Sequence, residues 1–197
     1  LPRAVAQLRA RDAVDRLQRG TDALGFGGHR MRGVIALGAL AALVACTPPG
    51  QVRRAPEVRI ASVALFDATR FAGRWQVAAS HVPGCEGAWM NWIPAANGYA
   101  LEGTDCTGAR PEPLRGAAVV AGPGARIIAE SAFGGDPVWV LWVDQDFRVA
   151  ALGTPSGRWA MILAREGAAR ADRLAAAREV LDFNGYDLGQ MIGTGAR

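Results

Sequence analysis

The chain has 197 residues with 22 basic and 18 acidic side chains, which gives a formal net charge of +4. The positive excess is confined to the first 45 residues, because residues 46–197 hold 15 basic and 15 acidic side chains. All 22 basic residues are arginines, a bias typical of a GC-rich genome. The charge therefore does not favour a nucleic-acid-binding protein, and the 152 residues from 46 onward are enough for one domain with its own core.

A short apolar run follows Met31 and Arg32 and ends at Cys46. Residues 33–45 carry no charge, and as a helix they would span about 20 Å, too short for a bilayer core of about 30 Å. A positive start, a short apolar stretch and small residues before a cleavage site are typical of a secretory signal peptide. The last four residues, Leu-Val-Ala-Cys, resemble the lipobox of bacterial lipoproteins, which implies cleavage before Cys46 and a lipid on its sulfur. The alternative is a buried helix with an incidental cysteine.

This interpretation divides the chain into four parts. Residues 1–30 lie upstream of a plausible start methionine and are expected to be absent from the mature protein, and residues 31–45 form the signal peptide. Residues 46–65 contain three prolines and scattered charge, which favours a lipidated N-terminus and a flexible tether with a reach of about 25 Å. Residues 66–197 form the folded domain. Thr47, after the lipidated cysteine, resembles the pattern of lipoproteins sent to the outer membrane.

Short apolar runs, broken by Gly, Pro, Asn and Asp, fill the domain up to residue 164. Eight candidate strands at about ten-residue spacing, with no helix between them, predict an antiparallel meander closed as a barrel or split as a sandwich. The expected strands are 73–80, 88–93, 99–105, 116–120, 126–131, 138–143, 147–152 and 159–164. The last of these is apolar on both faces, as expected for a strand that lines an interior and is covered outside.

A helical pattern follows the last strand. Leu174, Ala177 and Leu181 recur at helical spacing within residues 168–181, and Asn184-Gly185 is a stop signal. The apolar pair at 191–192 is expected to form a short edge strand.

Four segments resemble motifs of the lipocalin family, in the family's order and with plausible spacing. The first is Gly73-Arg74-Trp75, the Gly-x-Trp opening of the first strand, and the second is the turn at 143–148. The third is the strand 159–165, which ends in the family's arginine. The fourth is Gly185-Tyr186-Asp187, after the helix.

Behind a lipobox, these motifs resemble the outer-membrane lipoprotein branch of the bacterial lipocalins, which is related to apolipoprotein D. The resemblance implies an all-β fold, an eight-stranded antiparallel up-and-down β-barrel with a C-terminal α-helix packed outside. In that fold Trp75 would close one end, Arg165 would stack on its ring and Gly73 would give the chain room to turn. Val143 and Gln76 depart from the family's pattern, and the middle of the domain matches it poorly, which leaves the identity of the ligand open.

The three cysteines have different expected roles. Lipidation consumes Cys46 and leaves Cys85 and Cys106 beyond the cytoplasmic membrane, where disulfides persist. If the strands 88–93 and 99–105 form a hairpin, these two cysteines come opposite each other at its open end. The sequence therefore predicts a structural disulfide worth about 3 kcal/mol. The alternative is a free reactive thiol, which some lipocalins use in catalysis.

Other catalytic groups are sparse. His81 is the single histidine of residues 46–197, and no His, Cys and Asp cluster has the spacing of a metal site. The Gly153–Gly157 segment is expected in a turn with no base beside it, so it does not indicate a serine nucleophile. The sequence thus predicts a protein that is not an enzyme and that has no cofactor and no metal.

The resulting hypothesis is a lipid-anchored lipocalin of the outer membrane, facing the periplasm, that binds a fatty acid or lysophospholipid in its barrel. Its role would be lipid storage, transport or envelope maintenance; its partners would be the lipid ligand and the membrane, with no nucleic acid, and its oligomeric state stays open. One alternative is a thiol-dependent enzyme that uses Cys85 or Cys106, with His81 as base. The other is a structural envelope module with a filled barrel.

Strand alternation assigns a set of apolar side chains to the ligand pocket, although a register shift of one residue would invert any strand. The expected lining residues are Tyr99, Leu101, Phe133, Trp139, Leu141, Trp159 and Met161.

Overall fold

The computed structural model describes residues 51–194, so the expected signal peptide, the lipidation site at Cys46 and the first residues of the tether lie outside the described residues. Within the described part, the strands are β1 (Gly73–Ser80), β2 (Trp89–Ala95), β3 (Gly98–Asp105), β4 (Glu112–Val120), β5 (Arg126–Ile128), β6 (Val138–Val143), β7 (Val149–Gly153), β8 (Ala160–Ala164) and β9 (Ile192–Gly193). The helices are α2 (Ala68–Phe71) and α3 (Ala171–Phe183), with single 3-10 turns η1 (Phe133–Gly135) and η2 (Leu188–Gln190).

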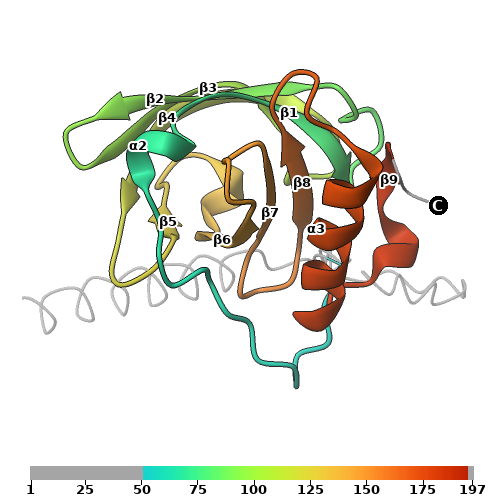
Figure 1. The fold of residues 1–197 in the computed structure, drawn as a ribbon. Helices are drawn as coiled ribbons and strands as arrows, with labels where there is room; N and C mark the ends of the chain where they lie inside the picture. Colours follow the sequence, from blue (N-terminus) through green and yellow to red (C-terminus); the bar gives the residue numbers. More distant parts are fainter. Residues whose placement is uncertain (1–50, 195–197) are drawn as a thin grey trace, which may run out of the picture. The chain divides into compact units, whose positions relative to one another are not determined.

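Eight strands form a closed antiparallel barrel (Figure 1). The strands pair in chain order from β2 to β8, β1 pairs with β8, and β1 also pairs with β2, which closes the ring. The short strand β9 adds to the far end of β1, with Gly193 opposite Ala79. Helix α3 packs outside β6, β7 and β8. The predicted up-and-down barrel with an outer C-terminal helix is therefore confirmed, and the sandwich is excluded.

Strand boundaries differ from the sequence-based expectation at β4 and β5. Strand β4 begins at Glu112 instead of residue 116, because the β3–β4 hairpin pairs without a break as far as Asp105 opposite Glu112. Strand β5 ends at Ile128 instead of residue 131. The following residues form a loop that carries η1.

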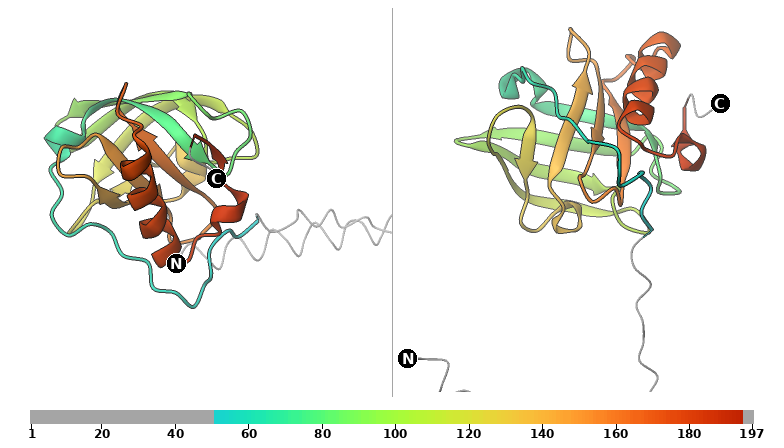
Figure 2. Two further views of the ribbon diagram at one scale, coloured as in Figure 1. Left: turned by 45° about the vertical axis from the view of Figure 1, so that its right-hand side comes forward. Right: turned by 90° about the horizontal axis from the view of Figure 1, so that it is seen from below.

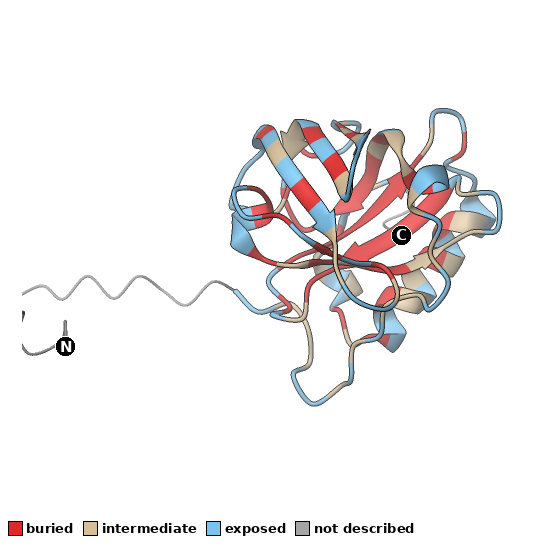
Figure 3. Cartoon of the chain, turned by 90° about the vertical axis from the view of Figure 1, so that its left-hand side faces the viewer, coloured by how far each residue is buried: buried red, intermediate tan, exposed pale blue. Residues whose placement is uncertain are grey.

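Burial differs between the two sides of the barrel (Figure 3). Strands β7 and β8 are buried at every position, because α3 covers their outer face, whereas β3 alternates between buried and exposed positions. On α3 the buried side chains are Leu174, Ala177 and Leu181, the residues expected from their spacing. The apolar core thus has two layers, one inside the barrel and one between the barrel and α3.

Residues 51–66, which we call the N-terminal strap, run along the outside of the barrel past α3 (Figure 2). The Arg53 N–H donates to the Gly157 carbonyl at 2.7 Å, and the Ala55 N–H donates to the Gly185 carbonyl at 2.9 Å. The expectation of a free tether as far as residue 65 is therefore wrong from residue 51 onward. Proline and charge in the sequence indicated an unpaired chain, but backbone groups of the domain take up the strap's hydrogen bonds.

The strap also adds backbone hydrogen bonds beside β5, where the strand pairing of the barrel is shortest. Strand β5 has only two paired positions with each of its neighbours. Next to it, the Val63 N–H donates to the Val140 carbonyl at 2.9 Å, and the Val63 carbonyl accepts from Ala125 at 3.2 Å. These contacts satisfy backbone groups that the short strand leaves unpaired.

Candidate ligand site at the barrel mouth

The mouth of the barrel is the end formed by the β1–β2, β3–β4, β5–β6 and β7–β8 loops. A hollow of about 380 Å³ lies there, within the size range of small-molecule sites. Three of these loops and the start of the strap line it. The lining residues are Gln51, Arg53, Thr107, Gly108, Ala109, Phe133, Gly134, Asp136, Arg158 and Trp159.

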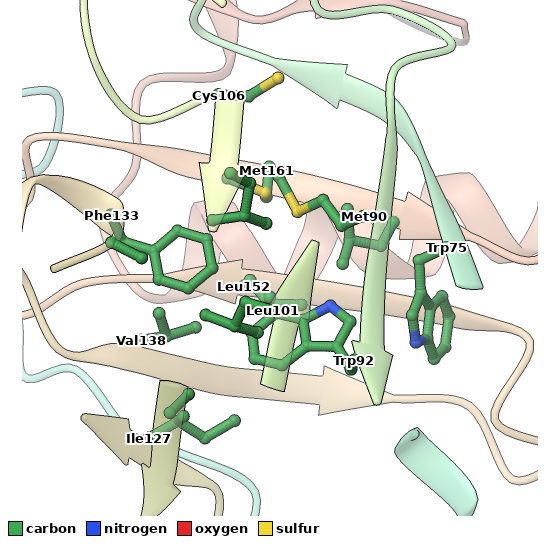
Figure 4. Close-up of a cluster of buried hydrophobic side chains, with 14 of the residues drawn as sticks. Trp75, Met90, Trp92, Leu101, Cys106, Ile127, Phe133, Val138, Leu152 and Met161 are labelled. Atoms are coloured by element: carbon green, nitrogen blue, oxygen red, sulfur yellow. The ribbon is translucent and has the colours of Figure 1, made fainter. Parts of the chain in front are cut away.

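The floor of this hollow is aromatic. Phe133 and Trp159 line it, and both belong to the buried interior cluster. The Phe133 ring is 6.1 Å from the Trp159 ring on one side and stacks on Trp92 at 5.6 Å on the other, between ring centroids. Phe133 thus stands between two indoles, inserted into the barrel from the β5–β6 loop. Figure 4 shows it beside the apolar residues of the interior.

The rim of the hollow is charged. Asp136 is buried, and Arg158 binds its two oxygens through Nη2 at 2.7 Å and Nε at 2.9 Å. The Ser156 hydroxyl donates to the same carboxylate at 3.0 Å. Arg53, on the strap, donates to the Gln190 side chain at 2.8 Å. The rim side chains carry two positive charges and one negative charge, so their net charge is positive. The rim therefore favours a ligand whose anionic head lies at the rim and whose apolar part lies on the aromatic floor.

The loop that carries Phe133 has an unusual backbone. Phe133 has a φ of 56°, in the left-handed region that non-glycine residues rarely adopt. Its N–H donates to the Asp105 carboxylate at 2.8 Å. Gly134 and Gly135 follow with positive φ, which glycine adopts without a steric cost. The Asp105 contact holds the Phe133 backbone in this strained conformation, with its ring in the interior.

Two buried indole N–H groups have no hydrogen-bond acceptor among the described residues, those of Trp92 and Trp159. Both side chains are at most 2% exposed. In Figure 4 the indole nitrogen of Trp92 lies on the edge of the ring turned toward Met90 and Met161. The other polar groups of the interior cluster that we describe, the Tyr99 hydroxyl and the Trp75 indole N–H, have backbone acceptors, so the N–H groups of Trp92 and Trp159 differ from them.

The structure brings five of the seven expected lining residues into the interior cluster. Two of them, Phe133 and Trp159, also line the mouth hollow. Tyr99 lies at the opposite end, where its hydroxyl donates to the Ala68 carbonyl at 2.8 Å. The five are Tyr99, Leu101, Phe133, Trp159 and Met161.

The placement of Trp139 and Leu141 in the pocket is wrong. Both pack in the outer layer under α3, and the interior residues of β6 are Val138 and Val140. Both faces of β6 are apolar, so periodicity alone did not fix its register, and a β-bulge after Val140 shifts it further. The rim residues Asp136, Arg158 and Arg53 were missed altogether. The Gly-Gly-Asp-Pro turn that contains Asp136 was the only signal for them in the sequence.

The predicted disulfide is confirmed. Cys85 and Cys106 are bonded, with their Cα atoms 6.0 Å apart, and both are fully buried. The bond joins the β1–β2 loop to the end of β3, at the mouth. Neither cysteine is a free thiol, which removes the nucleophile from the thiol-dependent enzyme hypothesis. Within residues 51–194, no group of three metal-binding side chains is close enough to hold a metal ion.

The end opposite the mouth is closed by Trp75. The Arg165 guanidinium lies over the Trp75 ring, with Cζ 3.8 Å from the ring centroid. It also donates to the carbonyls of Ala72 at 2.7 Å and Arg74 at 2.8 Å. The Trp75 indole N–H donates to the Phe71 carbonyl at 2.8 Å. These contacts are structural, since every partner is a backbone carbonyl or an aromatic ring of the protein itself.

His81 connects β8 to the chain after α3. Its Nδ1 lies 3.2 Å from the Ala160 carbonyl oxygen and its Nε2 lies 3.1 Å from the Asp187 carbonyl oxygen. Burial lowers the pKa of His81 below its ordinary value of 6.5, and the charge of Arg53 lowers it further, against the opposing effect of the two carbonyls and the Asp187 carboxylate.

We expect the stability of the protein to fall as the pH drops below 6.5. Between the lowered pKa of the folded state and pH 6.5, the folded state holds fewer protons than the unfolded state. The stabilisation is therefore complete above pH 6.5 and is lost progressively as the pH falls to the pKa of the folded state. The melting temperature between about pH 7.5 and 5.5 measures this effect, above the range in which most carboxylates titrate. His81→Gln should flatten the profile, and an unchanged slope in this variant would assign the effect to other groups.

No protein-family model matches this sequence, and no curated protein matches it. Solved structures of similar fold include apocrustacyanin C1, with 13% identity over 70% of this chain and 89% of that chain, at a TM-score of 0.48. H1 crustacyanin from the lobster Homarus americanus has 15% identity over 70% of this chain and 89% of that chain, at a TM-score of 0.45. Insecticyanin from the tobacco hornworm Manduca sexta has 16% identity over 69% of this chain and 84% of that chain, at a TM-score of 0.47. Crustacyanin and insecticyanin are lipocalins with an eight-stranded barrel. The barrel assignment for this chain rests on its own strand pairing.

Proposed function

We propose that this protein is a lipid-anchored lipocalin of the bacterial outer membrane, akin to the lipoprotein branch related to apolipoprotein D. In this proposal it binds a fatty acid or lysophospholipid through the mouth of its barrel, for lipid storage, transport or envelope maintenance. The observation that carries the proposal is the mouth hollow, which combines an aromatic floor of Phe133 and Trp159 with a rim of Arg53 and Arg158. Such a site matches an amphipathic ligand with one apolar chain and a charged head.

Affinity would come from the apolar chain. Each methylene group moved from water into the interior contributes about 0.8 kcal/mol, so several methylenes outweigh the cost of ordering the ligand. The side chains around the interior are apolar or aromatic, among them Met90, Leu152 and Met161. The head would stay at the rim, where the charges of Arg53 and Arg158 exceed that of the Asp136 carboxylate paired with Arg158.

The position of the strap supports a membrane-anchored carrier. Gln51 and Arg53 line the mouth hollow, and the lipobox cysteine is only five residues before Gln51. Five extended residues span at most about 17 Å. A lipid on Cys46 would therefore hold the mouth next to the bilayer, where a single-chain lipid reaches it without crossing much water. Among residues 51–194, no helix is long and apolar enough to cross a membrane.

Mass spectrometry of the chain produced in a bacterium that processes lipoproteins tests the anchor. We expect protein in the membrane fraction to begin at Cys46 and to carry a lipid there. Cys46→Ala should abolish both the cleavage and the lipid. A chain that keeps residues 31–45 in both forms would contradict the anchor. Native spectra of the same membrane-derived protein should show adducts with the masses of single-chain lipids.

A filled structural barrel is the second candidate, and the packed aromatic interior is the observation that favours it. Rings follow one another at centroid distances of 5.3 to 6.1 Å from Phe71 through Trp92 and Phe133 to Trp159. If this packing is permanent, no ligand enters. If Phe133 only occupies the ligand's place, its removal opens the barrel.

Phe133→Ala separates the two candidates. We expect this variant to bind a fluorescent fatty acid about ten times more tightly than the wild type, because the ligand no longer has to displace a buried ring. Phe183→Ala is the matched control, since the Phe183 side chain is 79% exposed on α3 and should leave the affinity unchanged. An absence of binding in both the wild type and Phe133→Ala would favour the filled structural module.

A further inference from the structure

We infer that the ligand is an ester-linked single-chain lipid, whose ester carbonyl oxygen accepts a hydrogen bond from the indole N–H of Trp159. The inference rests on the proposed function and deepens it by choosing among single-chain lipids. It assigns Trp159 as a specificity-determining residue at the mouth.

The first step is that the Trp159 indole N–H is buried without a hydrogen-bond acceptor. The side chain is 2% exposed, and its N–H has no acceptor among the described residues. Burying a polar group without a hydrogen bond is costly, and most buried N–H groups in native proteins are paired. Trp159 also lines the mouth hollow, so a ligand that enters there reaches this side chain, and we infer that it supplies the missing acceptor.

The second step is the depth of Trp159 below the rim. Arg158 precedes it in the chain and lines the same hollow, together with Arg53. A phosphate head bound by these arginines would place the ester carbonyl of a lysophospholipid a few bonds deeper, at the level of the indole. A free fatty acid would place its carboxylate at the rim and only methylene groups at that level. An N–H donor beneath the charged rim therefore selects the ester.

The third step is the space for the acyl chain. The Phe133 ring lies 6.1 Å from the Trp159 ring and is buried in the interior cluster, so it occupies space that an acyl chain would need. Its backbone is in the left-handed region, and Gly134 and Gly135 follow it. A loop with these features can turn the ring out of the barrel through rotations at its glycines. The acyl chain then takes the position of the ring between Trp92 and Trp159.

A pair of lipids that differ in one oxygen atom tests the inference. The full chain, held in an amphipathic polymer, is titrated with a palmitoyl lysophospholipid and with its hexadecyl ether analogue, which has the same head but no carbonyl. We expect the wild type to bind the ester about ten times more tightly. Trp159→Phe should remove this preference, because it weakens the binding of the ester by the lost hydrogen bond as well as by any lost ring contact, whereas the ether loses the ring contact alone.

Trp92→Phe is the matched control, because it removes the other buried indole N–H without an acceptor, deeper in the barrel. It should keep the preference for the ester. Loss of the preference in Trp92→Phe, or its persistence in Trp159→Phe, would overturn the assignment to Trp159. Equal wild-type affinities for ester and ether would overturn the inference and leave the proposed function standing. If neither lipid binds, the inference fails, and the fluorescent fatty acid titrated against the wild type and Phe133→Ala decides whether the proposed function fails with it.

Discussion

Trp75→Ala is expected to destabilise the protein by about 3–5 kcal/mol, the cost of truncating a large buried aromatic residue. The side chain is fully buried, its ring packs 5.0 Å from the Phe71 ring, and its indole N–H bonds to the Phe71 carbonyl. The change would also leave the Arg165 guanidinium without the ring on which it stacks. Urea unfolding of the two proteins measures the difference.

Trp89→Ala is the matched control for this prediction. Trp89 is 37% exposed and also lies against an arginine, with the Arg74 Cζ 4.8 Å from its ring centroid. A cation–π contact near the surface contributes about 0.5–1 kcal/mol, so this variant should lose much less stability than Trp75→Ala. Similar losses in the two variants would show that Trp75 does not close the barrel in the way described.

Removal of the disulfide with Cys85→Ala and Cys106→Ala is expected to cost about 3 kcal/mol and to lower the melting temperature by about 10 °C. The bond joins residues 21 positions apart, and it connects the β1–β2 loop to the end of β3. Without it, the unfolded chain gains conformational freedom, and the mouth loses a covalent connection. Thermal unfolding of the oxidised wild type and of the double variant measures the change.

Reduction of the wild type gives an independent control. A reducing agent should lower the melting temperature of the wild type toward that of the double variant and should leave the double variant unchanged. Thiol labelling shows whether the wild type is fully reduced. If it is, and its melting temperature is nevertheless unchanged, the bond has no stabilising role.

Local patterns in the sequence were sufficient for the order of elements. Short apolar runs between turn residues predicted the eight strands, and helical spacing predicted α3, because these signals depend on neighbouring residues only. The pairing of Cys85 with Cys106 followed in the same way, since the two cysteines flank one hairpin. Both faces of the strand 159–165 are apolar, and this pattern correctly predicted that β8 is covered on both sides.

Only the tertiary structure decided the register of β6, the course of residues 51–66 and the composition of the mouth. Trp139 and Val140 are both apolar, so only packing against α3 or the interior determines which of them faces inward. The strap is held by backbone hydrogen bonds, which leave no trace in residue types. Arg53, Asp136 and Arg158 come from segments far apart in the chain, and they meet at the mouth because the barrel closes. Their proximity is a long-range property of the closed sheet, which no local pattern encodes.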